Sequence, residues 1–301
     1  MTKIYASELA KIITGMRTAY KCGENAMEYA RNINMDDSNS TLATLIAYDL
    51  QAGSYIDRVR KFPSQNIDWC KQIQSIIAPY LTSDTSILEV GCGEATTLAE
   101  VLNLTTGVDI EAYGFDISWS RCNQGNQWLI EQGQKAKLFV GDMFNIPLED
   151  DCIDIVYTSH SIEPNGGKET EALKELYRVA KKALVIIEPV YELASKEARE
   201  RMLSHGYITN LSGSAQELGL NISDFKLLDY SPNPLNPSGV MIIEKNSKND
   251  KKISWRCPVT FEKLSDESDV FTQMETGLVY PVLRGIPMLT SNNVIIASGI
   301  K

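Results

Sequence analysis

Long apolar runs, closely spaced cysteine pairs and basic tracts are all missing from this sequence. No stretch of eighteen apolar residues occurs, so nothing is typical of a membrane-spanning helix. The six cysteines show no Cys-x-x-Cys spacing, and the residues after Met1 lack the apolar core of a signal peptide. We therefore expect free thiols, no membrane association and a cytoplasmic protein.

The acidic net charge of the chain also limits the classes of partner that it is expected to bind. The formal net charge is −10, and no long basic run occurs, which is a poor match for binding a nucleic-acid backbone. Charge alone does not exclude a local basic patch. With 301 residues and 43% apolar content, the chain is long enough for one large domain and a small one.

Hydrophobic periodicity divides the chain into three parts and a linker. Residues 1–80 predict a helical N-terminal cap, and residues 81–245 alternate strand-like and helix-like patterns. Residues 246–252 form a charged linker, and residues 253–301 a small β-rich module. The helical stripes of the cap are Leu9, Ile12, Ile13, Met16 and Tyr20, then Ile67, Cys70, Ile73, Ile77 and Leu81.

Seven short apolar runs between residues 81 and 245 predict strands. Helices fit between the first five, for example 119–132 and 168–181, which indicates a doubly wound α/β fold with a mostly parallel sheet covered on both faces. Prolines at 232, 234 and 237 exclude a helix between the last two strands, so we expect these two to pair as an antiparallel hairpin. The expected strands are 86–90, 111–116, 136–140, 153–158, 183–188, 226–231 and 239–244.

The loop after the first expected strand is the most informative segment. It contains Gly91-Cys92-Gly93, and glycines allow a sharp turn with room for a ligand beside the backbone. Dinucleotide sites share a Gly-x-Gly turn. Here, however, Glu89 suits the ammonium of a methionine moiety better than a pyrophosphate, and Thr96 replaces the third glycine of the dinucleotide pattern.

Acidic residues also end the next two expected strands. Asp116, followed by Ile117, is placed to accept hydrogen bonds from both hydroxyls of a ribose. Gly141 and Asp142 close the third strand, where Asp142 suits an adenine amino group and Met143 can line the ring. The structural alternatives are a solvated strand-end carboxylate for Asp116 and a helix N-cap for Asp142.

On these residues, the segment from about 80 to 245 resembles the class I methyltransferases that depend on S-adenosylmethionine (SAM). It is similar in particular to the small-molecule branch that includes enzymes of quinone biosynthesis. The resemblance implies SAM as cofactor and a seven-stranded sheet with an antiparallel last strand. The cofactor contacts that we expect are Glu89, Gly91, Cys92, Gly93, Asp116, Ile117, Gly141, Asp142, Met143 and Ser159.

Acceptor contacts are expected where the fourth and fifth strands end, because these ends face the same crevice as the glycine loop. The candidate catalytic residues are His160, Glu163 and Glu188, and Asn165 and Tyr191 are candidate acceptor contacts. A hydroxyl acceptor needs a base, and histidine has a suitable pKa for that task. Two alternatives stay open: His160 only packs beside the cofactor, and Glu163 lies in a solvated loop.

Tyr48, Gln51 and Tyr55 belong to the segment ahead of the sheet. In relatives of the resembled family this segment closes over cofactor and acceptor, so these side chains are expected to exclude water there. The alternative is an amphipathic helix that packs its aromatic side chains inward. The same helical region could also pack against a second copy, which makes a homo-oligomer one expectation.

The last fifty residues resemble the small zinc-ribbon-like activator of tRNA and translation-factor methyltransferases. The resemblance rests on Cys257-Pro258 and on the Tyr-Pro-x-x-x-Gly-Ile-Pro run at 280–287. Thr260 replaces the second cysteine of the zinc pattern and no later cysteine exists, so one thiolate is left and we predict no zinc. Such a module could dock onto its own catalytic domain by strand addition to a sheet edge.

The sequence therefore predicts a SAM-dependent methyltransferase that acts on oxygen or nitrogen of a small polar metabolite, with a sugar or sugar nucleotide as one candidate. Methylation of tRNA or of a translation protein is the second hypothesis. It is disfavoured by the acidic charge and because residues 162–166 lack an Asn-Pro-Pro-Tyr-like run. A SAM-binding scaffold without turnover is the third.

Overall fold

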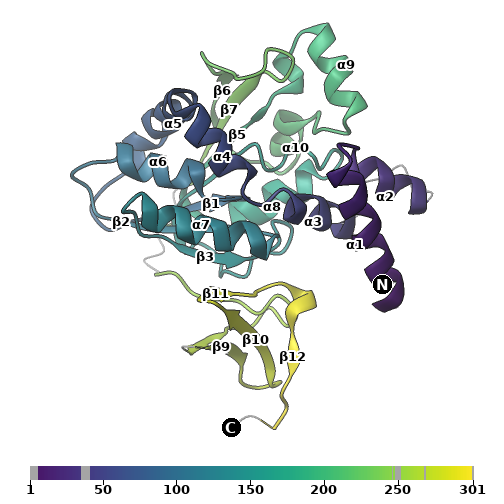
Figure 1. Cartoon of the computed structure of the whole chain (residues 1–301). Helices are drawn as coiled ribbons and strands as arrows, with labels where there is room; N and C mark the ends of the chain where they lie inside the picture. The colour runs from purple at the N-terminus through teal and green to yellow at the C-terminus, as the bar shows by residue number, and fades with distance from the viewer. Residues whose placement is uncertain (1–5, 35–40, 246, 248–251, 268, 300–301) are drawn as a thin grey trace.

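The computed structural model describes residues 6–34, 41–245, 247, 252–267 and 269–299 (Figure 1). Within these ranges the chain forms a group of N-terminal helices, a central α/β domain and a small antiparallel module below it in the view of Figure 1. The linker predicted at 246–252 lies mostly outside the described residues.

The N-terminal helices fall into two groups. Helices α1 (Ala6–Lys21), α2 (Ala26–Asn34) and α3 (Thr41–Leu50) pack around their own small core. Helices α4 (Ser54–Lys61) and α5 (Pro63–Ile77), followed by the short η1 (Ala78–Tyr80), join the core of the α/β domain instead. The predicted helical stripes are confirmed at their buried positions, which are Ile12, Met16, Cys70, Ile73 and Ile77.

The central sheet has seven strands in the order β3-β2-β1-β4-β5-β7-β6. Only β7 runs antiparallel to its neighbours β5 and β6, so the predicted doubly wound sheet with a terminal hairpin is confirmed. The strands are β1 (Thr85–Val90), β2 (Ile110–Asp116), β3 (Lys137–Val140), β4 (Ile153–Ser159), β5 (Ala180–Pro189), β6 (Ile222–Leu227) and β7 (Ser238–Glu244).

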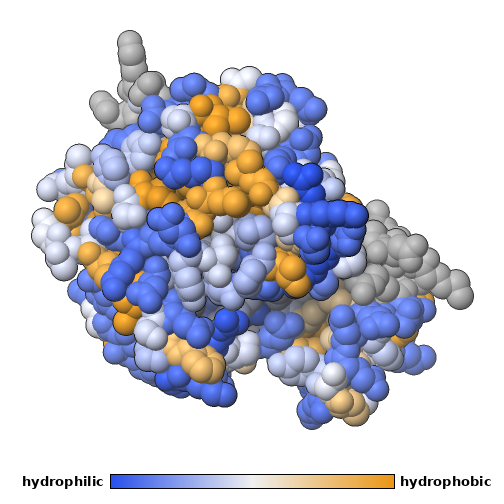
Figure 2. All heavy atoms as spheres, turned by 90° about the horizontal axis from the view of Figure 1, so that it is seen from above, coloured by the Kyte–Doolittle hydropathy of each residue, from blue (hydrophilic) through white to orange (hydrophobic). Residues whose placement is uncertain are grey.

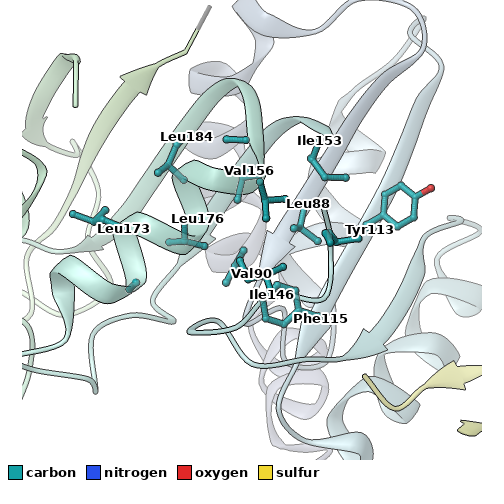
Figure 3. Packing of buried hydrophobic residues seen from close by; sticks show 14 of the residues in the cluster. Leu88, Val90, Tyr113, Phe115, Ile146, Ile153, Val156, Leu173, Leu176 and Leu184 are labelled. Carbon is teal, nitrogen blue, oxygen red and sulfur yellow. The ribbon is translucent and has the colours of Figure 1, made fainter. Parts of the chain in front are cut away.

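Helices cover both faces of this sheet (Figure 1). Along β1, Ile87 joins the core formed with α5, α6 (Thr96–Leu104) and α7 (Trp119–Glu131). Leu88 points to the opposite face, where Figure 3 shows it beside Val156, in the core cluster that also contains Leu173 and Leu176 of α8 (Glu169–Val179). All six residues of β1 are buried, including the polar Thr85, Ser86 and Glu89, because helices cover both faces of the sheet. The remaining helices are η2 (Tyr191–Leu193), α9 (Lys196–Ser204) and α10 (Leu211–Glu217).

Two sequence predictions about these elements are wrong. The sixth strand spans 222–227 and not 226–231, because the backbone beyond it leaves the sheet: Tyr230 bonds the side-chain amide of Gln72 on α5. No helix forms between β3 and β4 either. The backbone of this connection pairs with the C-terminal module, as Glu149 donates to the Ser254 carbonyl and Arg256 donates to the Pro147 carbonyl.

The C-terminal module docks on the edge of the sheet beside β3. The Leu289 amide donates to the Val140 carbonyl at 2.9 Å, and Met288 forms a parallel bridge with Val140. The expected docking at a sheet edge is confirmed, although by one bridge and not by a full strand. Its elements are β8 (Ser265–Glu267), β9 (Val270–Gln273), β10 (Leu278–Leu283), β11 (Ile286–Pro287), η3 (Ser291–Asn293) and β12 (Ile295–Ile296).

Apolar side chains extend the core into this module. The Trp255 ring contacts Phe139 of β3 and Phe271 of β9 edge-on, with ring centroids 5.1 Å apart in each case. On the outside, the face seen in Figure 2 is largely hydrophilic and is crossed by an apolar band. No helix among the described residues is long and apolar enough to cross a membrane.

Replacing Trp255 with alanine should lower the free energy of unfolding by about 3 kcal/mol, because a large ring is lost between two others. Urea denaturation measures this change. Ile296→Ala is the matched control in the same module, since Ile296 is 80% exposed and should change stability by less than about 0.5 kcal/mol. Equal effects of the two variants would contradict the packing role of Trp255.

Candidate cofactor and acceptor site

A cavity of about 460 Å³ lies at the carboxyl ends of β1, β2, β3 and β4. This volume is in the range of small-molecule sites. Side chains from α3, α4 and α5 and from the connection between β6 and β7 complete its wall. Every cofactor residue expected from the sequence lines it: Glu89, Gly91, Cys92, Gly93, Asp116, Ile117, Gly141, Asp142, Met143 and Ser159.

The glycine turn after β1 is held in a left-handed conformation. Gly91 and Gly93 have φ angles of 65° and 54°, which favour glycine. A Cβ on Gly91 would lie 2.4 Å from the Cβ of Ser161, so a side chain there has no room. The Asp116 carboxylate accepts hydrogen bonds from the Gly93 amide at 3.1 Å and the Ser118 amide at 2.9 Å. Each oxygen keeps a further lone pair for a ligand hydroxyl.

Glu89 is a fully buried carboxylate at the wall of the cavity. Its Oε2 atom has no hydrogen-bond partner, and burial raises the pKa of Glu89 to about 8. A buried carboxylate without a partner is costly unless a cation or donor reaches it. The ammonium of SAM fits this need. At the other end, Asp142 accepts from the Phe144 amide at 2.9 Å through Oδ1, which leaves Oδ2 for an adenine amino group.

Two buried charges that the sequence did not predict connect the N-terminal helices to the α/β domain, one from the loop after β1 and one from α7. Glu94 is 1% exposed and accepts from the amides of Gly53 and Ile56, each at 2.9 Å, at the start of α4. The Arg121 guanidinium lies between the rings of Tyr48 and Tyr55, 4.7 Å and 4.6 Å from their centroids. The sequence signal was weak, because neither residue type is expected to be buried.

Tyr48 and Tyr55 therefore line the cavity, as expected for residues that close over a ligand. Gln51 does not: it lies in the turn between α3 and α4, where its Oε1 atom is 3.4 Å from Arg121 Nη2. The single helix proposed as the alternative is interrupted at this turn, since Gly53 has a φ of 100°.

His160 and Glu163 meet at the acceptor end of the cavity. His160 Nδ1 is 3.2 Å from Glu163 Oε2, and Nε2 is 2.7 Å from the Ser238 hydroxyl. Burial alone would lower the pKa of His160, but the Glu163 carboxylate outweighs it and raises the pKa above its ordinary value. The Trp69 ring contacts His160 edge-on at 5.2 Å. Both ring nitrogens of His160 are thus occupied.

Glu188 is placed differently from our expectation. It is fully buried away from the cavity lining, and it accepts from the amides of Ser161, Ile162 and Glu163 at 3.0 to 3.1 Å. Burial raises the pKa of Glu188 to about 7. In this geometry it holds the loop after β4 and does not line the cavity. Tyr191 also lies outside the lining, in η2.

Other lining residues have no counterpart in the sequence predictions. Asn165 lines the cavity as expected, but so do Trp69 of α5 and Asn236 of the connection between β6 and β7. Asn236 is 8% exposed, and its Nδ2 atom donates to Glu163 Oε2 at 3.3 Å. The proline-rich sequence around Asn236 indicated only the absence of a helix, so its contribution depends on the tertiary fold.

Comparisons with known proteins agree with this arrangement. Residues 87–183 match the family model described as a methyltransferase domain. The chain is 27% identical over 176 residues to ajmaline N-methyltransferase of Rauvolfia serpentina, which covers 53% of this chain. The match spans 59% of that protein, so it extends over little more than half of the relative's length.

Two solved structures share the fold. Magnesium protoporphyrin IX methyltransferase from Synechocystis PCC 6803, with bound SAH (S-adenosylhomocysteine), has a TM-score of 0.51 and 12% identity, covering 67% of this chain and 99% of that one. A complex of the Haloferax volcanii Trm112 methyltransferase activator with a methyltransferase has a TM-score of 0.50 and 15% identity, covering 65% and 96%. The fold is that of Rossmann-like methyltransferases, and residues 87–183, which match the methyltransferase domain model, supply much of the cavity lining.

Binding of SAM should release a proton from Glu89. At pH 6.5 a carboxyl with a pKa of about 8 is protonated in the free protein, and a ligand ammonium favours its ionised form. Affinity should therefore rise between pH 6 and 7.5, by at most about tenfold per pH unit for one proton. Calorimetry in buffers of different ionisation enthalpy measures the release, and Glu89→Gln should abolish it. Equal proton release by the wild-type protein and by Glu89→Gln would show that the proton comes from another group.

Glu94→Gln should loosen the attachment of α4 to the cofactor loop. The substitution removes the charge from two hydrogen bonds, each worth about 1.5 to 3 kcal/mol when the acceptor is ionised. Hydrogen exchange at the Gly53 and Ile56 amides should accelerate at least tenfold. The exposed Glu197 on α9 supplies the control Glu197→Gln, which should leave these amides unchanged. Protection that survives in Glu94→Gln would disprove the attachment.

Proposed function

We propose that the protein is a SAM-dependent methyltransferase that transfers a methyl group to oxygen or nitrogen of a small polar acceptor. One observation carries this proposal: the residues expected to hold SAM and a separate group of polar side chains, including His160, Glu163 and Asn236, line the same cavity. A cofactor and an acceptor bound there would lie next to each other, as methyl transfer requires.

Each end of the cavity has a distinct role in this proposal. Glu89 holds the ammonium of SAM, Asp116 the ribose hydroxyls and Asp142 the adenine amino group. Bound SAM supplies an activated methyl group, so the chain mainly has to align the acceptor and receive a proton. Glu163 is better placed to receive it than His160, because both nitrogens of His160 are already in hydrogen bonds. His160 then acts as a positioning residue.

The size of the site supports a small acceptor over tRNA or a protein. The wall includes Tyr48 and Tyr55, which Arg121 holds over the cavity. A macromolecule would need an open surface at this place. The net charge of −10 also opposes binding to nucleic acid. A sugar or sugar nucleotide is one acceptor class that this proposal includes.

The C-terminal module is proposed to be a zinc-free counterpart of the activator protein, joined in cis to its catalytic domain. Its docking beside β3 supports this proposal, as does the environment of Cys257. The Cys257 sulfur is buried and lies 3.3 Å from the Tyr280 hydroxyl and 3.4 Å from the Thr260 amide, so protein groups surround it. The described residues include no group of three or more side chains suited to a metal ion.

Calorimetric titration with SAM and SAH tests the proposed function. The wild-type protein should bind both with micromolar affinity. Asp116→Ala should weaken binding at least 100-fold, because two charge-assisted ribose hydrogen bonds are lost, worth together about 3 kcal/mol or more. Asp57→Ala is the control, since the Asp57 side chain is 80% exposed. Labelled methyl from SAM then reports turnover on small acceptors. A folded wild-type protein that binds neither compound would overturn the proposal.

A further inference from the structure

The acceptor end of the cavity presents oxygen atoms that have no partner. Asn236 Oδ1 and Ser161 Oγ are buried without a hydrogen bond, and both residues line the cavity. Glu163 Oε2 accepts from His160 and Asn236, but no described residue donates to its other oxygen, Oε1. A buried acceptor such as Asn236 Oδ1 is costly unless a ligand supplies a donor.

The orientation of Asn236 follows from its neighbour. Its Nδ2 atom donates to Glu163 Oε2 at 3.3 Å, and a carboxylate oxygen can only accept. The amide oxygen must therefore be the free atom. Since Asn236 and Glu163 are joined by this bond, Oδ1 and Oε1 belong to one cluster, and both are acceptors.

Most donors around this cluster are already in use, and the exception is the Ser161 hydroxyl, which can donate as well as accept. Both ring nitrogens of His160 are hydrogen-bonded, and Glu188 accepts from the amides of residues 161–163. The side-chain nitrogen of Asn165 donates to the carbonyls of Ser161 and Ile162. A ligand that presents acceptor oxygens would therefore meet like groups at Asn236 Oδ1 and Glu163 Oε1, whereas a ligand with N–H donors would meet its complement at these two atoms.

The charges and aromatic rings at this end of the cavity also favour a cationic ligand. Glu163, Trp69 and Tyr48 all line the cavity, and carboxylates and aromatic rings both attract cations. Among the lining cations, Arg121 is held between two tyrosine rings, while Arg58 and Lys168 are exposed. Lys168 lies over Phe144, on the Asp142 side of the site. The buried acceptor end thus lacks a lysine or arginine among the described residues.

We propose that the acceptor is a small protonated amine whose N–H groups bind Glu163 Oε1 and Asn236 Oδ1, and that it is methylated on nitrogen. This inference rests on the proposed function. The ammonium first gives one proton to the Glu163 carboxylate. The nitrogen lone pair then forms the new N–C bond with the methyl group, and the C–S bond breaks with its electron pair left on sulfur. The products are a methylated ammonium and SAH.

Matched probes distinguish an amine from a hydroxyl acceptor. Protein saturated with SAH is titrated by calorimetry with benzylamine and benzyl alcohol, and with glucosamine and glucose. At least one amine should bind ten times more tightly than its hydroxyl partner at pH 7. Equal binding within both pairs, or no binding of either amine, would overturn the inference.

Variants test the residues that carry the proposal. Glu163→Gln and Asn236→Ala should each weaken amine binding at least tenfold, with SAH binding retained as the check on folding. Glu171→Gln, on the exposed side of α8, should leave amine binding unchanged. Amine selectivity that survives Glu163→Gln would also overturn the inference. If wild-type protein fails to bind SAH, the proposed function itself is wrong, and the two failures are distinguishable.

Discussion

The parallel pairing of β1 with β2 and β4 is the constraint on which the rest of the structure depends. Val90 is in register with Phe115 of β2 and with Thr158 of β4, so all three strands end at one edge of the sheet. The glycine turn, Asp116 and the loop after β4 follow directly from these ends. Because the sheet buries β1 on both faces, the turn cannot shift without breaking the core. The cavity is a consequence of this register.

Buried carboxylates divide into two groups according to their partners. Glu94 and Glu188 are saturated by backbone amides, and each fixes a segment at the cavity: α4 in one case and the loop after β4 in the other. Glu89 and Glu163 each keep an oxygen without a protein donor. A carboxylate held by amides positions the backbone, whereas one with a free oxygen is available to a ligand. Carboxylates therefore serve two purposes here: some fix the backbone around the cavity, and others are available to a ligand.

The C-terminal module shares a hydrophobic core with the central α/β domain and also pairs with the backbone of that domain. It bonds the edge strand β3 and pairs with the connection between β3 and β4, where the sequence pattern had predicted a helix. Phe139, Trp255 and Phe271 make this contact apolar, so removing the module would expose a sheet edge and aromatic surface together. Stability of the catalytic fold and presence of the module are therefore linked.

The sequence by itself determined the doubly wound sheet, its terminal hairpin and the cofactor side of the cavity. These features depend on local patterns: alternating strand and helix periods, and glycine or acidic residues at strand ends. Tertiary structure decided the acceptor side. Asn236 bonds Glu163, and Trp69 contacts His160, each across more than seventy residues of sequence. Glu188 accepts from backbone amides, and the connection after β3, where a helix was expected, pairs with the module. Local sequence patterns could not predict these contacts, because the residues that make them come together only when the sheet has formed.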